Sequence, residues 1–594
     1  MENKKLRTVI WAAGPAFFVM LLAAYPQAAL WISKGTAFTG AYFVSNYDET
    51  AYSAYVNSLM NGRPRVNDPQ TGNDSPAGES LYSVQFVPAY ASAAIFKMFG
   101  LSTGSGFALL NFLLPIFSAL AIFLLVKDLS GDDRLAGSAV VFALCAGTAI
   151  AYQGELRQWL TGGVLIDFFP YLRRYQPGLG FPIFFLFCAA IWRSFAAERW
   201  NRIVLWATVA GFLLVILMFT YFYLWTAAAA WLAIFALASA IFGPLSTKSA
   251  ARSLIPLAIL GLGSIKYFAM LAQRDTHMDD VQLLHLTRMP DIAAVPVILG
   301  LVAAAAVLVV YLKGKAEISK PLAAFTISFG ITPLLLLNQQ VITGRSLQPV
   351  HYEIFIANYM AGIALVLAVW LIFRVGGAYE KLVVYMAIAA AIWGVIETSG
   401  TAAKYTPIEG LREQAIPAFA YLNSQPIQKD AAGRYPAVFA SSMMVADYVP
   451  TATGFRSLWN PHINSAGGLS QAENKELFLA HIYFGGVSEE EFERALTQGL
   501  YEFRAAVFGG GRALAALKSG ADPITPAEIK KETAGYTQFK ERIASGAIPQ
   551  LPSIEYAMVP IEAEPNWSNL DKLYERSEPR DLGIFRIYRL RPLK

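Results

Sequence analysis

Long apolar runs recur between residues 8 and 397, and they constrain the fold more than any other feature of the sequence. A helix rises 1.5 Å per residue, so about 20 apolar residues cross the hydrocarbon core of a bilayer. Inside lipid the backbone polar groups must bond within their own segment, so each run is expected to be helical. The sequence therefore predicts a polytopic α-helical membrane protein with about 11 transmembrane helices. The runs lie near 8–32, 104–126, 134–152, 181–196, 203–222, 224–243, 253–272, 292–312, 321–338, 352–374 and 379–397.

The composition agrees with this prediction. Hydrophobic residues make up 55% of the 594 positions and charged residues only 15%, whereas soluble domains carry about 25% charged residues. The formal charge of +5 is too small for a chain of this length to indicate nucleic-acid binding. The two cysteines, Cys145 and Cys188, both fall in apolar runs, so they indicate neither a disulfide framework nor a metal site.

The distribution of basic residues predicts the orientation of the spans. Lys4, Lys5 and Arg7 precede the first run, which we interpret as an uncleaved span with a cytoplasmic N-terminus. Alternate loops are short and basic, as the positive-inside rule expects of cytoplasmic loops. An odd number of spans then places the C-terminus on the periplasmic or extracellular side, in a setting that we take to be the bacterial inner membrane. The prediction is weakest at residues 220–223, because a missing turn there would reverse every later loop.

A domain boundary is expected where the apolar runs end. Residues 1–398 would form a transmembrane domain whose large first extracytoplasmic loop covers 33–103, and residues 399–594 a soluble α/β domain. Strands and helices alternate in the second part, which favours a single domain. We interpret His462 and His481 as structural, because neither has a partner pattern. The expected elements are helices at 411–424, 473–483 and 489–503, strands at 437–441, 504–508, 570–576 and 583–590, and a loop at 447–451.

Two adjacent carboxylates, Asp48 and Glu49, open the first outer loop. Apolar and aromatic residues follow at helical spacing, so the pair heads a short amphipathic helix against the membrane or the bundle. A partly desolvated carboxylate at the bilayer surface suits a general base. Adjacent helical residues point about 100° apart, so only one of the two is expected to face a substrate. The alternative is that Asp48, or Thr50, merely caps the helix.

Cationic side chains gather in the other outer loops. Guanidinium groups bind phosphate oxygens bidentately, so Arg173, Arg174 and Arg345 suit a phosphate at headgroup level, and His351 lies near Arg345 in the sequence. Lys266, within an apolar run, is a further candidate, because an ionisable residue at membrane depth is costly to retain. The alternatives are ordinary headgroup contacts for the arginines, an interfacial position for His351 and snorkelling for Lys266.

The loop after the seventh run contains His277, Asp279 and Asp280. Imidazole and carboxylate groups of this kind bind divalent cations. A solvated acidic loop is the other interpretation, and the more favoured one.

The acidic pair, the helix after it, the number of spans and the C-terminal domain together resemble the GT-C superfamily. These membrane glycosyltransferases use polyprenyl-phosphate-linked sugars. The resemblance implies an inverting transfer of a sugar to a glycan, lipid or protein acceptor at the outer face, among membrane lipids and without nucleic acid. It places Asp48 or Glu49 at the position of the catalytic residue; a divalent cation (Mg²⁺ or Mn²⁺) is optional. The Trp-Trp-Asp signature of oligosaccharyltransferases is absent from the sequence, which argues against transfer of a whole oligosaccharide to protein.

Two other functional classes stay open. A transporter or flippase of a lipid-linked glycan would also be polytopic, but transporters commonly show internal repeats and charges at mid-membrane. Here the charges gather on one side and the two halves show no similarity, which favours chemistry at one surface. The second is a non-enzymatic subunit for assembly or polymer export, in which the acidic pair is only a cap.

Overall fold

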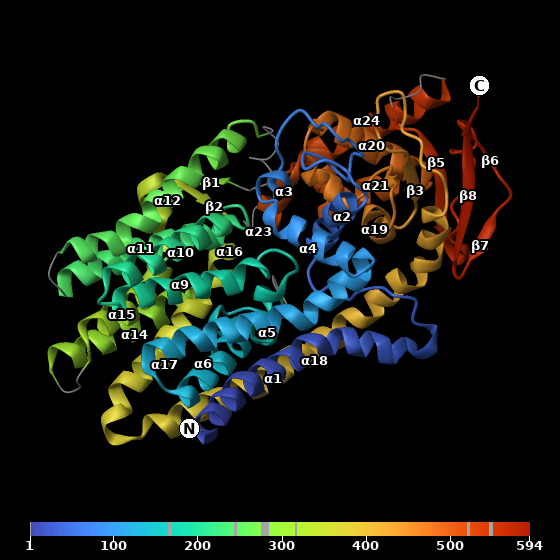
Figure 1. Cartoon of the computed structure of the whole chain (residues 1–594). Coiled ribbons are helices and arrows are strands. Elements are labelled where there is room, and N and C mark those ends of the chain that lie inside the picture. The colour runs from blue at the N-terminus through green and yellow to red at the C-terminus, as the bar shows by residue number, and fades with distance from the viewer. Residues whose placement is uncertain are drawn as a thin grey trace.

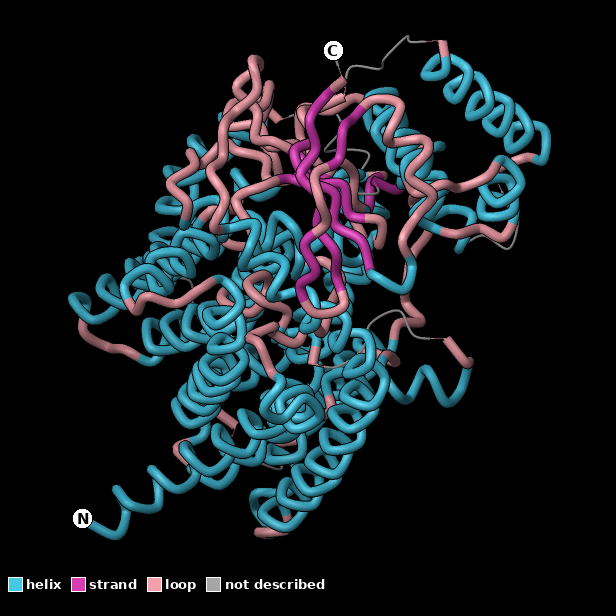
Figure 2. Tube along the Cα trace, turned by 90° about the vertical axis from the view of Figure 1, so that its right-hand side faces the viewer, coloured by secondary structure: helices cyan, strands magenta, loops and turns pink. Residues whose placement is uncertain are grey.

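The structure is a computed structural model that describes residues 2–163, 169–242, 246–274, 284–314, 318–518, 523–545 and 551–593. Long helices form a bundle, and the larger of the two sheets lies in a smaller domain at one end of it (Figures 1 and 2). The N-terminus lies at the far end of the bundle, and the C-terminus lies in the domain that carries the strands (Figure 1).

Each of the eleven predicted runs has a helical counterpart. Among the described residues, nine helices are long and apolar enough to cross a membrane. They are α1 (Glu2–Lys34), α5 (Thr103–Ser130), α10 (Trp200–Met218), α11 (Phe222–Phe242), α12 (Thr247–Leu271), α14 (Val295–Leu312), α15 (Lys320–Thr343), the continuous α16 (Pro349–Tyr352), η3 (Glu353–Ala357) and α17 (Asn358–Phe373), and α18 (Tyr379–Asn423). The remaining two runs form shorter helices, α6 (Asp133–Cys145) and α9 (Gly180–Ala196).

The prediction of two spans on either side of residues 220–223 is confirmed. α10 ends at Met218 and α11 begins at Phe222. The turn is compact because the Tyr221 amide donates to Leu217 O at 2.9 Å. A residue from another segment also stabilises the turn, since Gln176 Nε2 donates to Thr220 O at 2.8 Å. Tyr221 is thereby buried at the end of the bundle nearest the smaller domain.

The predicted helix after the acidic pair is α2 (Glu49–Met60), and it packs against the bundle, which is one of the two positions expected for it. Ten of its twelve residues are buried. Asn57 Nδ2 donates to Thr453 O at 2.8 Å, and the Ser53 and Thr451 hydroxyls are 3.0 Å apart, so α2 is enclosed between the bundle and the C-terminal domain. The other short elements of the transmembrane part are η1 (Gly35–Ala37), α3 (Leu81–Val84), α4 (Val87–Met98), α7 (Gly147–Ile150), α8 (Gly154–Thr161), η2 (Pro170–Leu172), η4 (Arg374–Gly376) and the antiparallel strands β1 (Leu284–Leu286) and β2 (Arg345–Leu347).

The C-terminal part is a single α/β domain, as predicted. Its sheet has the order β4-β3-β5-β8-β6, with β7 also paired to β8; β3 is parallel to β4 and β5, and β8 is antiparallel to its neighbours. The strands are β3 (Ala437–Ala440), β4 (Arg456–Ser457), β5 (Ile554–Pro560), β6 (Tyr574–Arg576), β7 (Arg580–Leu582) and β8 (Phe585–Pro592). The helices are α19 (Met443–Ala452), η5 (Pro461–Ser465), α20 (Gln471–Phe484), α21 (Glu489–Thr497), α22 (Tyr501–Phe508), α23 (Gly510–Lys518), α24 (Pro526–Ala544) and η6 (Ile561–Ala563).

Three local predictions in this domain were wrong. The helix expected over 489–503 stops early, because Gly499 adopts φ +78° and ends α21. The strand expected at 504–508 belongs to the helix α22, an ambiguity inherent in short apolar runs. The loop expected at 447–451 lies within α19.

α18 joins the two parts without a break. It runs for 45 residues, from the bundle into the C-terminal domain (Figure 1). The expected boundary between residues 398 and 399, and the separate helix expected at 411–424, both fall inside this one helix. The C-terminal domain is therefore attached by continuous helix rather than by a loop.

Candidate active site

The two adjacent carboxylates have different environments. The Asp48 side chain is 43% exposed and makes no capping hydrogen bond to α2; instead Arg173 Nη1 donates to its Oδ2 at 2.5 Å. Glu49 is fully buried, and so is the guanidinium of Arg174 that binds it at 2.7 Å. Glu49 also accepts the Arg174 backbone amide at 2.8 Å. Asp48 thus presents a carboxylate to solvent, while Glu49 and Arg174 have no surface left for a substrate.

Arg173 connects Asp48 to the ends of two spans. Its side chain is 3% exposed, and its three nitrogen groups each have a partner: Asp48, the Gln176 carbonyl at 2.7 Å and the Tyr221 hydroxyl at 2.9 Å. The Tyr221 hydroxyl in turn lies 3.2 Å from His351 Nδ1. Sequence reasoning placed Asp48, Arg173 and His351 on one side of the membrane, and the structure brings them into one continuous polar chain.

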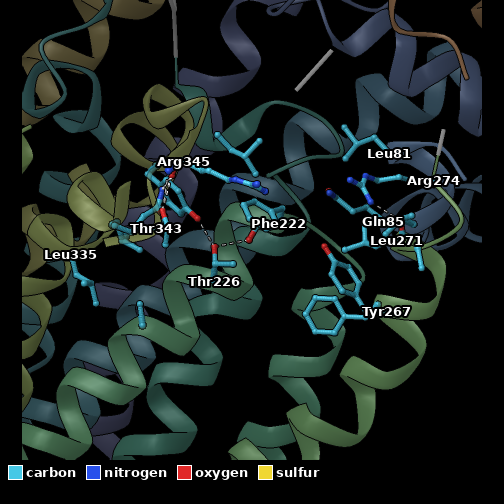
Figure 3. A pocket seen from close by; sticks show the side chains of 18 residues that line it. Leu81, Gln85, Phe222, Thr226, Tyr267, Leu271, Arg274, Leu335, Thr343 and Arg345 are labelled. Carbon is cyan, nitrogen blue, oxygen red and sulfur yellow. Dashed lines mark hydrogen bonds between the residues drawn. The ribbon is translucent and has the colours of Figure 1, made fainter. Parts of the chain in front are cut away.

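A cavity of about 840 Å³ is lined by residues next to two members of this chain. Phe222 and Tyr352, the neighbours of Tyr221 and His351 in the sequence, belong to its wall. Most of the wall is apolar and comes from α11, α12 and α15 (Figure 3). The lining residues are Leu81, Val84, Gln85, Phe222, Thr226, Ala230, Tyr267, Phe268, Leu271, Ala272, Arg274, Leu335, Leu336, Gln339, Thr343, Arg345, Leu347 and Tyr352.

The polar side chains of the cavity gather at one end. Arg345 lies on one side of that end and Arg274, with Gln85, on the other, while Leu335 and Tyr267 lie deeper (Figure 3). Two guanidinium groups facing one another across an apolar cavity suit an anionic headgroup. Arg274 follows the seventh span directly and was not among the cations predicted for the site.

Lys266 lies outside this arrangement. It is exposed on α12 and does not line the cavity, although its neighbour Tyr267 does. Its charge acts instead on Glu79, in the segment between α2 and α3. Burial raises the pKa of Glu79, but the bidentate bonds from Arg65 at 2.6 and 2.7 Å, together with Lys266, more than offset this and lower it. The Glu79 amide donates to Gln273 O at 2.9 Å, so this loop is held against the end of α12.

The predicted metal ligands His277, Asp279 and Asp280 lie outside the described residues. Within the parts of the chain that are described, no group of three or more His, Cys, Asp or Glu side chains is placed to hold a metal ion. The lining of the cavity includes two cationic side chains, Arg274 and Arg345.

One contact of the C-terminal domain was not predicted from the sequence. His462, interpreted as structural, forms a 2.7 Å ion pair with Asp447, and both side chains are buried. Burial lowers the pKa of His462, but the nearby Asp447 carboxylate outweighs this effect and the net pKa is raised. The pKa of Asp447 is raised by burial and lowered more by His462, so the net shift is downward. The two residues are on different elements, so no sequence spacing indicates the pair.

No known protein-family profile matches the sequence, and no curated protein matches it significantly. Among solved structures, the chain is similar to the oligosaccharyltransferase of Archaeoglobus fulgidus tethered to an acceptor peptide, with a TM-score of 0.47 and 13% identity over 85% of this chain and 72% of that one. A structure of the same enzyme with Zn and sulfate gives 0.42 and 13% over 92% and 68%. The archaeal enzyme with an inhibitory peptide and a dolichol-phosphate gives 0.42 and 12% over 92% and 69%. At this distance, neither a substrate nor a residue role can be transferred from them.

Proposed function

We propose that this protein is an inverting glycosyltransferase, which moves a sugar from a polyprenyl-phosphate donor to an acceptor hydroxyl at the outer face of the membrane. One observation carries the proposal. A solvent-accessible carboxylate, Asp48, is fixed by a buried arginine, and the residues that follow the other two members of its polar chain line an apolar cavity with two arginines at one end.

The cavity suits the donor. Its volume falls in the range of small-molecule sites, about 300–1,000 Å³, and its apolar wall can take isoprenoid units that leave the bilayer between helices. Arg274 and Arg345 would bind the phosphate and stabilise the negative charge that grows on it as the sugar leaves. Each guanidinium offers two parallel donors to phosphate oxygens, which a lysine cannot do.

Asp48 would act as the general base. The acceptor oxygen forms a bond to the anomeric carbon from the side opposite the phosphate, and its proton passes to the Asp48 carboxylate. The bond between the anomeric carbon and the phosphate oxygen breaks with its electron pair, which leaves polyprenyl phosphate and an inverted sugar. Arg173 would fix the direction of the carboxylate, and Tyr221 and His351 would hold Arg173 in turn. We assign Glu49 and Arg174 to the stability of the loop, because both are fully buried.

The test is sugar transfer by the purified protein in proteoliposomes that contain radiolabelled polyprenyl-phosphate hexoses and a panel of glycan, glycolipid and peptide acceptors. Asp48→Asn is expected to lower kcat by roughly 10²- to 10⁴-fold. Asp581→Asn is a matched control, because it also removes a carboxylate paired with an arginine (2.6 Å to Arg586) but lies on the edge strand β7.

Unchanged transfer by a folded Asp48→Asn protein would refute the assignment of Asp48 as the base. Movement of the labelled lipid between leaflets without any transfer, in wild type and variant alike, would instead support a flippase and overturn the proposed function.

A further inference from the structure

The C-terminal domain contacts the residues on both sides of the acidic pair. The ring of His462 stacks on Tyr47, which precedes Asp48, with centroids 4.3 Å apart and an interplanar angle of 26°. The hydroxyl of Thr50, which follows Glu49, lies 2.6 Å from Asp447 Oδ2 and 3.2 Å from His462 Nδ1. The Asp447–His462 ion pair of the C-terminal domain thus contacts the residue before Asp48 and the residue after Glu49.

The ion pair is itself held firmly. Asp447 comes from α19 and His462 from η5, and their side chains are 2% and 6% exposed. α19 makes a second contact with the same turn of α2, since the Thr451 hydroxyl donates to the Thr50 carbonyl at 2.9 Å. The first turn of α2 therefore rests on a buried polar contact with a domain that begins more than 300 residues later in the sequence.

We infer that His462 and Asp447 are positioning residues, which set the direction of the Asp48 carboxylate by holding Tyr47 and Thr50. The inference rests on the proposed function of Asp48. Asp48 makes no capping bond of its own, so its direction depends on Arg173 and on the backbone of residues 47–50. A displacement of about 1 Å at a reacting group costs roughly 10²-fold in rate, so a loosened first turn is expected to slow the chemical step.

Thr50→Val tests the contact with little change of shape, because it replaces only the hydroxyl by a methyl group. We expect faster hydrogen–deuterium exchange in residues 46–52, a fall in kcat of about 10²-fold and an unchanged KM for the lipid donor, since the cavity is not altered. Thr50→Ser keeps the hydroxyl and is expected to restore both the protection and kcat. Asp447→Asn, which keeps the size of the side chain but removes its charge, is expected to act in the same direction.

His481→Gln is the matched control. His481 is the other buried histidine of the domain and packs on Phe439 and Trp459. Its replacement perturbs the domain without touching α2, so exchange in residues 46–52 and kcat should stay at the wild-type level. If His481→Gln lowers kcat as much as Thr50→Val does, the loss of kcat reflects general destabilisation of the domain. That result would overturn the inference.

The inference and the proposed function fail in different ways. If Asp48→Asn abolishes transfer while Thr50→Val and Asp447→Asn keep the wild-type kcat, only the inference is overturned. Hydrogen–deuterium exchange in residues 46–52 that stays at the wild-type rate in both variants would also overturn the inference. This measurement needs no substrate. If Asp48→Asn transfers sugar normally, the assignment of Asp48 as the base fails and the inference falls with it.

Discussion

Arg173 Nη1 lies 2.5 Å from Asp48 Oδ2, and this bond joins the start of α2 to the segment before α9. The arginine is 3% exposed and the carboxylate 43%, so the charge that reaches solvent is the negative one. The guanidinium packs over Phe355 at 4.5 Å and binds the Tyr221 hydroxyl with its other terminal nitrogen. Its position is therefore fixed from several sides before any substrate arrives.

Arg173→Lys should keep the charge but lose activity. The guanidinium donates in three different directions, to Asp48, Tyr221 and the Gln176 carbonyl. A single ammonium group cannot reach all three partners. We expect kcat for sugar transfer to fall by roughly 10²-fold, measured as initial rates in proteoliposomes. Arg193→Lys is the control. Arg193 also pairs with an aspartate, at 2.6 Å from Asp128, but neither residue lines the cavity. Similar rates for both variants would contradict the assigned role of Arg173.

Glu49→Gln should act on stability. The substitution leaves the guanidinium of Arg174 fully buried without its carboxylate, which typically costs about 3–5 kcal/mol. We expect a clear fall in the midpoint of thermal unfolding in detergent. Glu380→Gln breaks an exposed pair with Arg134 and is expected to cost about 0–1 kcal/mol. A Glu49→Gln protein that unfolds at the wild-type temperature but has lost transfer would assign Glu49, and not only Asp48, to the chemistry.

Ala230→Trp should obstruct the cavity. Ala230 lines the wall on α11, and a tryptophan there would take up space that we assign to the isoprenoid chain. The KM for the lipid donor is expected to rise by at least about 10-fold. Leu237→Trp, on the same helix at a position 64% exposed, controls for the added indole. An unchanged donor KM in the Ala230→Trp protein would exclude this cavity as the donor site.

The Asp447–His462 pair should make stability depend on pH. The pKa of His462 is raised in the folded protein, so its contribution is complete below the unfolded value of about 6.5 and is lost as the pH rises through the folded pKa. The lowered pKa of Asp447 keeps that carboxylate charged throughout this range, so the change in stability comes from His462. Thermal unfolding from about pH 6 to pH 9 should therefore show a falling stability, which His462→Gln flattens. Parallel curves for the two proteins would contradict the linkage.

The sequence was sufficient for the helical architecture, because the length and apolarity of each run leave little alternative in lipid. Even the uncertain turn before α11 was predicted correctly. The relation between the acidic residues was accessible only in part. Adjacency on a helix indicates that Asp48 and Glu49 diverge, but it does not tell which one is buried.

Contacts between distant segments were beyond sequence reasoning. Arg274, Tyr221 and the Asp447–His462 pair reach the site because loops and a separate domain meet at one end of the bundle. Such contacts have no fixed spacing. The full burial of α2 could not be predicted from the sequence either. The pattern of α2 indicates one apolar face, but the C-terminal domain covers the opposite face as well.

The continuous helix α18 determines how the C-terminal domain is attached to the bundle. A helix of 45 residues is about 68 Å long, more than twice the thickness of the hydrocarbon layer. Its remaining part, with Pro407 and Pro417 inside it, is helical as well, so the C-terminal domain is carried on helical backbone and not on a flexible tether.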